Sequence, residues 1–320
     1  MPVTLAEAKK NTQDKLAAMV IDEFRKSSFL MNNITFDNCV SPQGGGATMT
    51  YTYIRLLTQP TAAFREINKE YTPQEVTKER HSVDLKVFGG SFEVDRVIAD
   101  MGGVVNEVTL QMQQKIKAAS ALFNDTVING DSGTDSKAFD GLEKALAGSS
   151  TEYTPTAAID LSTSDAVDKN YKVFLDVLDE FLMGLDGTPS FIGGNLKLIA
   201  KIRACARRAG MYQTSRNDIG QQIESYGNIP LVDLGAKPGT NDPVVPIGTD
   251  DSLGLTSLYA ARFGLDGFHA VSPSGTLPVK QWLPDFNTAG AVKKGEVEMI
   301  AAVALKATKS AGVLRKIKVS

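Results

Sequence analysis

The 320 residues carry 42% hydrophobic and 22% charged side chains and a formal charge of -3, a balance typical of globular chains that excludes disordered and fibrous classes. Two cysteines, Cys39 and Cys205, are too few for a disulfide framework and favour a reducing compartment. No apolar run approaches the ~20 residues that cross a bilayer, and the first residues lack the apolar core of a secretory signal, so we expect a cytoplasmic protein without membrane contact. The length predicts two lobes, because single cores rarely grow past ~250–300 residues.

The chain is expected to begin with an amphipathic helix. Thr4 and Glu7 form a capping-box signature, and apolar positions then recur at helical spacing as far as Arg25. These apolar positions are Leu16, Val20 and Phe24. Two alternatives stay open: the helix packs on its own domain, or it is an arm that lies on a neighbouring subunit.

Two alternating segments predict strands on either side of a long polar excursion. Residues 48–53 place threonines on one face and Met49, Tyr51 and Tyr53 on the other. Residues 82–87 alternate as well, and the side chains expected to share a face are Val83, Leu85 and Val87. Residues 61–81 are rich in charge, and unstructured loops above ~12–15 residues are uncommon unless they contact something outside the domain. We therefore predict a hairpin arm that is ordered by another copy of the chain.

Three helices are predicted in the middle of the chain. The first covers residues 103–129, with an apolar position every three or four residues, and Gly130 is expected to cap it in the left-handed conformation. At ~1.5 Å per residue this helix would be about 40 Å long, which favours a structural spine. A second helix covers residues 164–185 and is followed by a short strand at 190–192, and a third begins at an Asn195 cap.

The last part of the chain is predicted to form surface loops and then sheet. Residues 235–256 are rich in Gly, Pro, Asp and Thr, which is typical of loops. Residues 297–305 alternate, and after a break at 310–312 a final strand is expected from 313 to 319.

Side chains that could carry catalysis are scarce. The two histidines are His81, in the polar excursion, and His269, which has no partner at metal-ligand spacing. The sequence has no Gly-Lys dipeptide, no Gly-x-Ser-x-Gly and no Cys-x-x-Cys, which excludes the Walker phosphate loop, the nucleophile elbow and the redox pair. The carboxylates of NGDSGTDSKAFDG lack calcium-loop spacing and favour a turn stabilised by Asp131, Asp135 and Asp140. We predict no catalytic residue, no metal, no cofactor and no enzyme activity.

A basic cluster on the third helix has two interpretations. Arg203, Arg207 and Arg208 could bind phosphate, or they could form a solvated face or an intersubunit contact. The second interpretation is favoured because the helix is apolar along its other side.

The order of these elements resembles that of the Hong Kong 97-type major capsid proteins of tailed phages. INGD at 128–131 with FDGL at 139–142 resembles the segment that follows the family's spine helix, and GNIPLV at 227–232 resembles a strand of its axial domain. The phrases LTQPTAAFREINKEYTPQEVT, VFGGSFEVDRV and EVTLQMQQKIKA resemble a phage and prophage major capsid subgroup. The resemblance covers nearly the whole chain and depends on order and spacing.

The resemblance implies an α+β chain with the Hong Kong 97-type capsid fold. The implied parts are an N-terminal arm at 1–47, an extended β-hairpin loop at 48–92, a peripheral domain with the spine helix at 93–150, an axial domain at 151–284, and C-terminal strands at 285–320 that complete the peripheral domain.

The same resemblance implies a structural function in a virion. Identical subunits would assemble in the bacterial host cytoplasm into pentamers and hexamers of an icosahedral shell around double-stranded DNA, with only non-specific DNA contact. Scaffold, portal and decoration proteins are the further partners implied. The expected intersubunit contacts are Phe64, Arg65, Glu66, Lys69, Glu70 and Tyr71 on the hairpin, Leu16, Val20 and Phe24 on the arm, and Arg203 and Arg207 on the axial lobe.

Two departures from the family pattern limit these expectations. Only a short segment precedes the first predicted strand, which implies a separate scaffold or none. Lys69 and Lys78 lie in the loop, but residues 296–307 contain no asparagine, so we expect no covalent crosslink. The alternative is an encapsulin-type nanocompartment shell protein, against which the longer middle lobe and the phage-like phrases argue. A hydrolase that uses His269 is disfavoured because no nucleophile has a partner.

Overall fold

The computed structural model describes residues 29–39, 48–101, 106–210, 213–216, 222–249, 254–274 and 279–320. No helix among these residues is both long enough and apolar enough to cross a bilayer. The predicted N-terminal helix lies outside the described residues.

The described elements are strands, several short helices and three longer helices. In chain order they are α2 (Phe29–Asn33), β1 (Phe36–Asn38), β2 (Thr50–Leu56), β3 (Lys78–Asp84), β4 (Lys86–Asp95), α3 (Arg96–Met101), α4 (Glu107–Asn129), α5 (Leu142–Leu146), β5 (Glu152–Tyr153), β6 (Ile159–Asp160) and α6 (Ser164–Met183). They continue with β7 (Phe191–Gly194), α7 (Leu196–Arg208), β8 (Gln213–Arg216), β9 (Gln222–Tyr226), β10 (Ile229–Asp233), β11 (Leu255–Ala261), β12 (Phe268–Ser272), β13 (Val279–Trp282), β14 (Val292–Leu305), a 3-10 turn at Thr308–Ser310 and β15 (Ala311–Lys318).

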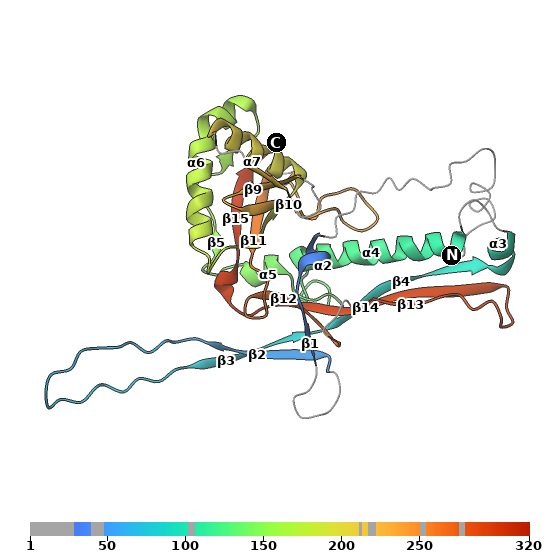
Figure 1. Cartoon of the computed structure of the whole chain (residues 1–320), viewed down its shortest axis with the longest axis horizontal. Coiled ribbons are helices and arrows are strands. Elements are labelled where there is room, and N and C mark those ends of the chain that lie inside the picture. The colour runs from blue at the N-terminus through green and yellow to red at the C-terminus, as the bar shows by residue number, and fades with distance from the viewer. Residues whose placement is uncertain are drawn as a thin grey trace.

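The lower part of the molecule in Figure 1, which we call the spine body, is a sheet backed by helix α4. Strand β14 is its centre and pairs antiparallel with β4, β12 and β13, while β1 pairs with β12. Alternate residues of β4 and β14 face the helix, so Phe92, Val94 and Val297 pack with Met112 in a buried cluster. The 23-residue helix confirms the predicted spine, although it begins at Glu107, where the Asn106 side chain accepts a hydrogen bond from the Thr109 amide.

The upper part, which we call the upper lobe, is a second sheet with helices α6 and α7 packed on it (Figure 1). Its strand order among the described residues is β5-β15-β11-β7-β10-β9-β8, and β6 also pairs with β15. Phe174, Leu178 and Leu198 of the helices are fully buried against Leu258 and Leu314 of the sheet. Thr163 and Asn195 cap the two helices, as the sequence predicts for Asn195.

Strand pairing does not follow the predicted division at residue 284. β12 and β13, which fall in the range predicted for the axial domain, belong to the spine body. β15, predicted to complete the peripheral domain, instead lies between β5 and β11 in the upper lobe. The physical reason is burial: Leu314 and Ile317 complete the core beneath α6 and α7.

The predicted hairpin is present and extends away from the spine body (Figure 1). Strands β2 and β3 pair antiparallel from Thr50 opposite Asp84 to Leu56 opposite Lys78. The predicted strand at 82–87 is wrong in one respect, because the strand is interrupted at Leu85, whose side chain is buried in the core. Val87 therefore does not share the buried face and is 53% exposed.

The sequence predicts the end of the spine helix correctly at Asn129, but the role it predicts for Gly130, the next residue, is wrong. Gly130 has a φ of -59°, which any residue can adopt, so no left-handed cap forms. A Cβ at Gly130 would instead lie 2.2 Å from the Phe139 carbonyl oxygen and 2.5 Å from that of Thr126. Glycine is required here because the 131–139 turn folds back directly on the helix end.

Candidate assembly surfaces

The hairpin formed by β2 and β3 has two chemically different faces. Register places Tyr51, Tyr53 and Arg55 beside Val83, His81 and Glu79, and these side chains point toward the body. The other face, which we call the outer hairpin face, is exposed throughout. Its side chains are Thr50, Thr52, Ile54 and Leu56 opposite Asp84, Ser82, Arg80 and Lys78.

The inner side chains fasten the root of the hairpin to the end of strand β14. The Tyr53 hydroxyl donates to the Leu305 carbonyl at 3.0 Å, and Arg55 Nε donates to the Lys306 carbonyl at 2.8 Å. A second Arg55 nitrogen also donates to the Leu305 carbonyl. The hairpin direction is therefore set by side chains that bind backbone atoms 250 or more residues further along the chain.

A charged cluster completes this attachment. The Tyr51 hydroxyl donates to Asp37 Oδ2 at 2.6 Å, while Lys306 Nζ lies 3.8 Å from the same oxygen and 5.2 Å from the centre of the Tyr51 ring. Burial acts to raise the pKa of Asp37, but hydrogen bonds from Tyr51 and the Asn38 amide, with the Lys306 charge, hold that pKa below its usual value. Burial and the bond to Asp37 raise the pKa of Tyr51.

His269 lies inside this cluster rather than in a catalytic cleft. It is fully buried on β12, and its ring packs edge-on against Tyr51 with centroids 5.7 Å apart. Burial, assisted by the Lys306 charge, lowers the pKa of His269 to about 4, so the ring is neutral near pH 7.

His81 does not lie in an irregular loop, contrary to the sequence-based prediction. It belongs to strand β3, where its ring stacks on Tyr53 with centroids 5.6 Å apart and Nε2 lies 3.2 Å from Glu79. Charged side chains interrupt the apolar alternation of residues 78–84, so the sequence pattern did not predict a strand at His81.

The hairpin tip gathers the six contact residues predicted from the sequence. Residues 56–80 are all exposed, with Phe64 fully so and Ile67 at 88%. The tip nevertheless has internal structure: Thr61 N donates to Gln74 Oε1 at 2.6 Å, the Arg65 guanidinium lies 5.6 Å from the Tyr71 ring centre, and Lys69 pairs with Glu66. Exposure agrees with a contact role for Phe64, Arg65, Glu66, Lys69, Glu70 and Tyr71 but does not test it. The arm residues Leu16, Val20 and Phe24 lie outside the described residues.

The arginines of α7 do not form one shared patch. Arg203 makes two hydrogen bonds to Glu224 Oε2 of β9, at 2.9 and 2.6 Å. Arg208 pairs with Asp168 of α6 and donates to the Ser164 hydroxyl at 3.0 Å. Arg207 is exposed. Two of the three side chains thus bind their own lobe, which leaves Arg207 the better candidate for an external contact.

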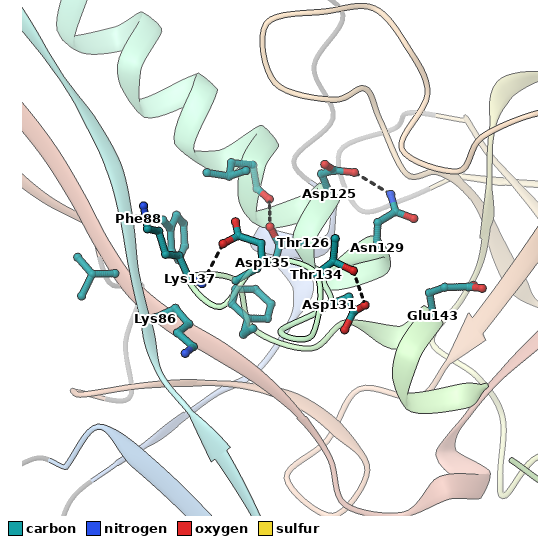
Figure 2. Close-up of a pocket in the computed structure, with 15 residues that line it drawn as sticks. Lys86, Phe88, Asp125, Thr126, Asn129, Asp131, Thr134, Asp135, Lys137 and Glu143 are labelled. Atoms are coloured by element: carbon teal, nitrogen blue, oxygen red, sulfur yellow. Dashed lines mark hydrogen bonds between the residues drawn. The ribbon is translucent and has the colours of Figure 1, made fainter. Parts of the chain in front are cut away.

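A pocket that the sequence did not indicate lies where β4, the end of α4 and the 131–139 turn meet (Figure 2). Its volume is about 610 Å³. The apolar lining is Val87, Phe88, Leu122, Ala138 and Phe139, and the charged lining is Asp125, Asp131, Asp135, Glu143, Lys86 and Lys137. Most lining residues fall in 122–143, and strand β4 adds Lys86, Val87 and Phe88 only through packing, so no local motif could have shown the pocket.

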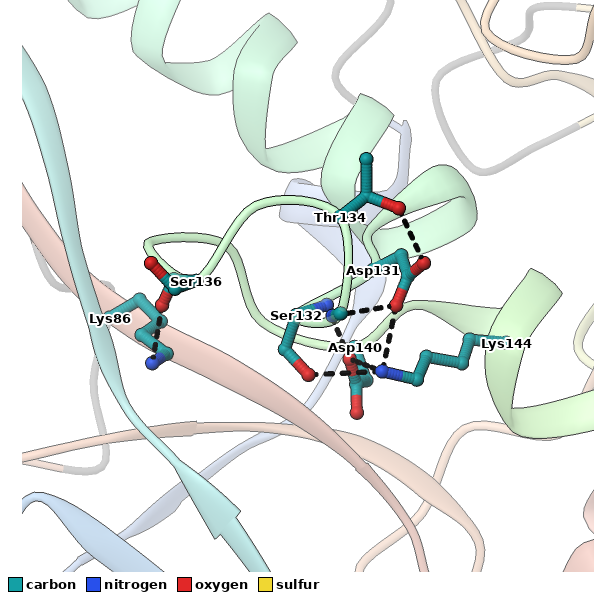
Figure 3. A network of polar contacts seen from close by, with 8 residues as sticks. Lys86, Asp131, Ser132, Thr134, Ser136, Asp140 and Lys144 are labelled. Carbon is teal, nitrogen blue, oxygen red and sulfur yellow. Dashed lines mark hydrogen bonds and ion pairs between the residues drawn. The ribbon is translucent and has the colours of Figure 1, made fainter.

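The predicted aspartate turn is confirmed beside this pocket (Figure 3). Asp131 and Asp135 each accept a backbone N–H two residues ahead, and Asp140 accepts the Ser132 N–H at 2.7 Å. Lys144 lies 2.7 Å from Asp131 and 2.9 Å from Asp140, and its hydrogen bond lowers the pKa of Asp131 to about 2. Within the described residues, no group of three His, Cys, Asp or Glu side chains could hold a metal ion.

Comparison with solved structures shows the fold. The chain is 15% identical to the SrpI encapsulin of Synechococcus elongatus PCC 7942, with a TM-score of 0.66 over 100% of this chain and 98% of that one. It is 14% identical to a chain from Mycobacterium phage Bobi (TM-score 0.61; 98% and 99% covered) and 13% identical to the capsid of Myoviridae Phage XM1 (TM-score 0.59; 95% and 97% covered). No protein-family model and no curated protein matches the sequence. The chain has the Hong Kong 97-type capsid fold.

Proposed function

We propose that this chain is a structural shell-forming protein, and specifically the major capsid protein of a tailed-phage head. Identical copies would form pentamers and hexamers, which close into an icosahedral shell around double-stranded DNA in the virion. No catalytic step is part of this function. Each copy would use heterologous contacts, in which one patch meets a different patch of its neighbour.

One observation carries the proposal. The fold matches whole capsid and encapsulin chains over nearly their full length, and its hairpin extends from the body with residues 56–80 entirely exposed. An isolated two-stranded hairpin is marginally stable in water, so such a segment is retained where other copies cover it. Many weak repeated contacts then add up in a closed shell.

The further partners proposed are a scaffold protein, a portal, decoration proteins and packaged DNA. A near-neutral chain, with a formal charge of -3, supports only non-specific contact with the genome, since strong attraction to phosphate would trap it. Assembly in the host cytoplasm and the absence of a membrane step belong to the same proposal.

A bacterial nanocompartment shell is the second candidate, and the full-length likeness to an encapsulin supports it. The phage head is preferred because phages supply more of the similar solved structures compared here, among them Mycobacterium phage Bobi and the capsid of phage XM1. The sequence phrases that resemble phage capsid proteins favour the same choice.

Electron microscopy of the purified recombinant chain tests the shell function. We expect closed shells or capsomer rings, and a chain that stays monomeric at high concentration would overturn the proposal. Co-expression with candidate cargo proteins and analysis of enclosed nucleic acid separate the two candidates. Small uniform shells filled with a folded protein would favour the nanocompartment.

A further inference from the structure

A charged cluster lies at the seam between the upper lobe and the spine body. Arg315 of β15 donates from Nη1 to Glu143 Oε1 at 2.7 Å and from Nε to Glu152 Oε1. The Tyr259 hydroxyl of β11 donates to the other carboxylate oxygen of Glu143. The Arg315 and Glu152 side chains are only 21% and 22% exposed, so water and salt screen this cluster less than they screen a surface ion pair.

Helix α5 joins this cluster to the end of the spine helix. Its adjacent residues Glu143 and Lys144 point about 100° apart around the helix axis, so they reach different partners. Lys144 Nζ lies 2.7 Å from Asp131 and 2.9 Å from Asp140, in the turn that follows α4 (Figure 3). Glu143 binds the two upper-lobe side chains named above. The five-residue helix is therefore bonded to the spine body through one residue and to the upper lobe through the next.

The backbone fixes the start of α5 on the spine helix as well. The Gly141 N–H donates to the Gly130 carbonyl at 2.8 Å. A Cβ at Gly141 would lie 2.5 Å from the Thr126 carbonyl oxygen, so only glycine lets the two backbones approach this closely. We therefore expect that a rotation of the upper lobe against the spine body would change the contacts of Glu143 before it moves α5.

Apolar packing at the seam does not by itself define one orientation. Leu142 and Leu146 of α5 are buried in the same cluster as Val313 of β15, and apolar contact is non-directional. Arg315, in contrast, uses two nitrogens of a planar guanidinium for two carboxylates, which ties the bonds to one geometry. The charged cluster thus supplies directional contacts across the seam.

We propose that Glu143 and Arg315 are positioning residues that fix the orientation of the upper lobe on the spine body, and thereby the curvature at which copies close into a shell. The orientation is a property of the single chain, and the step to curvature rests on the proposed shell function. The rotation between neighbouring copies decides whether an assembly closes. A copy whose lobes rotate against each other would meet its neighbours at variable angles.

Distances between the lobes test the orientation directly. Nitroxide labels on Gln113→Cys of α4 and Lys172→Cys of α6, both exposed positions, report the separation of the lobes by pulsed electron resonance, and the native cysteines are buried. Excess unlabelled chain keeps labels on different copies apart. Glu143→Gln, which keeps an acceptor for the Tyr259 hydroxyl, is expected to widen the distance distribution up to about twofold, because a neutral acceptor replaces a charge-assisted one of about twice the strength.

A conservative variant and a matched control complete this test. Arg315→Lys keeps the charge but cannot bind both carboxylates in one plane, so it should widen the distribution as Glu143→Gln does. Lys318→Gln, on the same strand, removes a pair with Asp160 that lies within the upper lobe, and it should keep the wild-type width. Wild-type widths in both Glu143→Gln and Arg315→Lys, or an equal widening in Lys318→Gln, would overturn the proposal.

Particle size tests the consequence for the shell. Electron microscopy should show a wider range of particle diameters for Glu143→Gln than for the wild type or Lys318→Gln. Wild-type diameters in a variant with a widened distance distribution would overturn the step from orientation to curvature. A wild-type chain that never assembles would contradict the shell function itself, while the distances still decide whether Glu143 and Arg315 fix the lobes.

Discussion

The upper lobe and the hairpin differ in how much of their side-chain surface the chain itself buries. In the upper lobe, α6 and α7 close over a sheet, and side chains such as Phe174, Leu178 and Leu198 lose all contact with water. In the hairpin, residues 56–80 are all exposed, and the root alone is fastened to the body. The comparison predicts that stability and assembly depend on different residues, so that each can be changed with little effect on the other.

The largest expected effect comes from making the same substitution in both regions. Phe174→Ala removes a fully buried ring and should lower the free energy of unfolding by about 3–5 kcal/mol. Phe64→Ala removes a fully exposed ring and should change it by less than about 0.5 kcal/mol while it reduces assembly. Denaturant titration and particle counts check the pair. Equal losses of stability would show that the hairpin tip packs on its own chain.

Acid should weaken the root of the hairpin through His269. Its pKa is about 4 in the folded protein against 6.5 unfolded, so between these values the unfolded chain binds more protons and stability falls as the pH falls. The loss is complete below pH 4 and amounts to at most about 3 kcal/mol. His269→Gln, which cannot take up this proton, should flatten the stability curve between pH 4 and 6.5. An unchanged slope in that variant would contradict the assignment.

A smaller effect is expected from the hydroxyl that joins β2 to β1. Tyr51→Phe removes the 2.6 Å hydrogen bond to Asp37 and should cost about 1 kcal/mol. Amide hydrogen exchange of strands β2 and β3 should become faster, while exchange in the upper lobe stays the same. Thr52→Val, on the exposed face of the same strand, is the control. Identical exchange in the two variants would show that the Tyr51 hydroxyl does not hold the hairpin.

The smallest effect on stability separates two arginines of α7. Arg203→Gln breaks the pair with Glu224 and should cost less than about 1 kcal/mol, since the pair is partly exposed. Arg207→Gln should leave stability unchanged and reduce assembly more than Arg203→Gln does. Thermal unfolding and sedimentation of both variants check this. The reverse order would identify Arg203 as the intersubunit contact despite its bond to Glu224.

Periodicity was sufficient where one element buries one continuous face. The spine helix, α6 and β14 were predicted from spacing, because each has an apolar side that is buried, and α7 was predicted from its Asn195 cap. It failed for most of β4, where Gly89 and Gly90 interrupt the pattern. A Cβ at Gly89 would lie 2.0 Å from the Val297 carbonyl oxygen, so the close contact between β4 and β14 requires glycine at this position. The same glycine interrupts the apolar alternation by which a strand is recognised in the sequence.

The candidate surfaces could be predicted only in part. The exposed tip was predicted from its composition, since charged residues without apolar spacing cannot fill a core. The root was not, because Tyr51 and Arg55 bind Asp37 and the carbonyls of Leu305 and Lys306, and no local pattern connects these positions. The pocket depends on the same kind of long-range packing.

The placement of β14 and β15 has a consequence for how the protein is made. Each strand lies inside its sheet rather than at an edge, and a three-residue turn is the only helix between them. A ribosome that has not yet released residues 292–318 therefore holds a chain in which both sheets lack an internal strand. We therefore expect a nascent chain to become competent to join other copies only after residues 292–318 have left the ribosome.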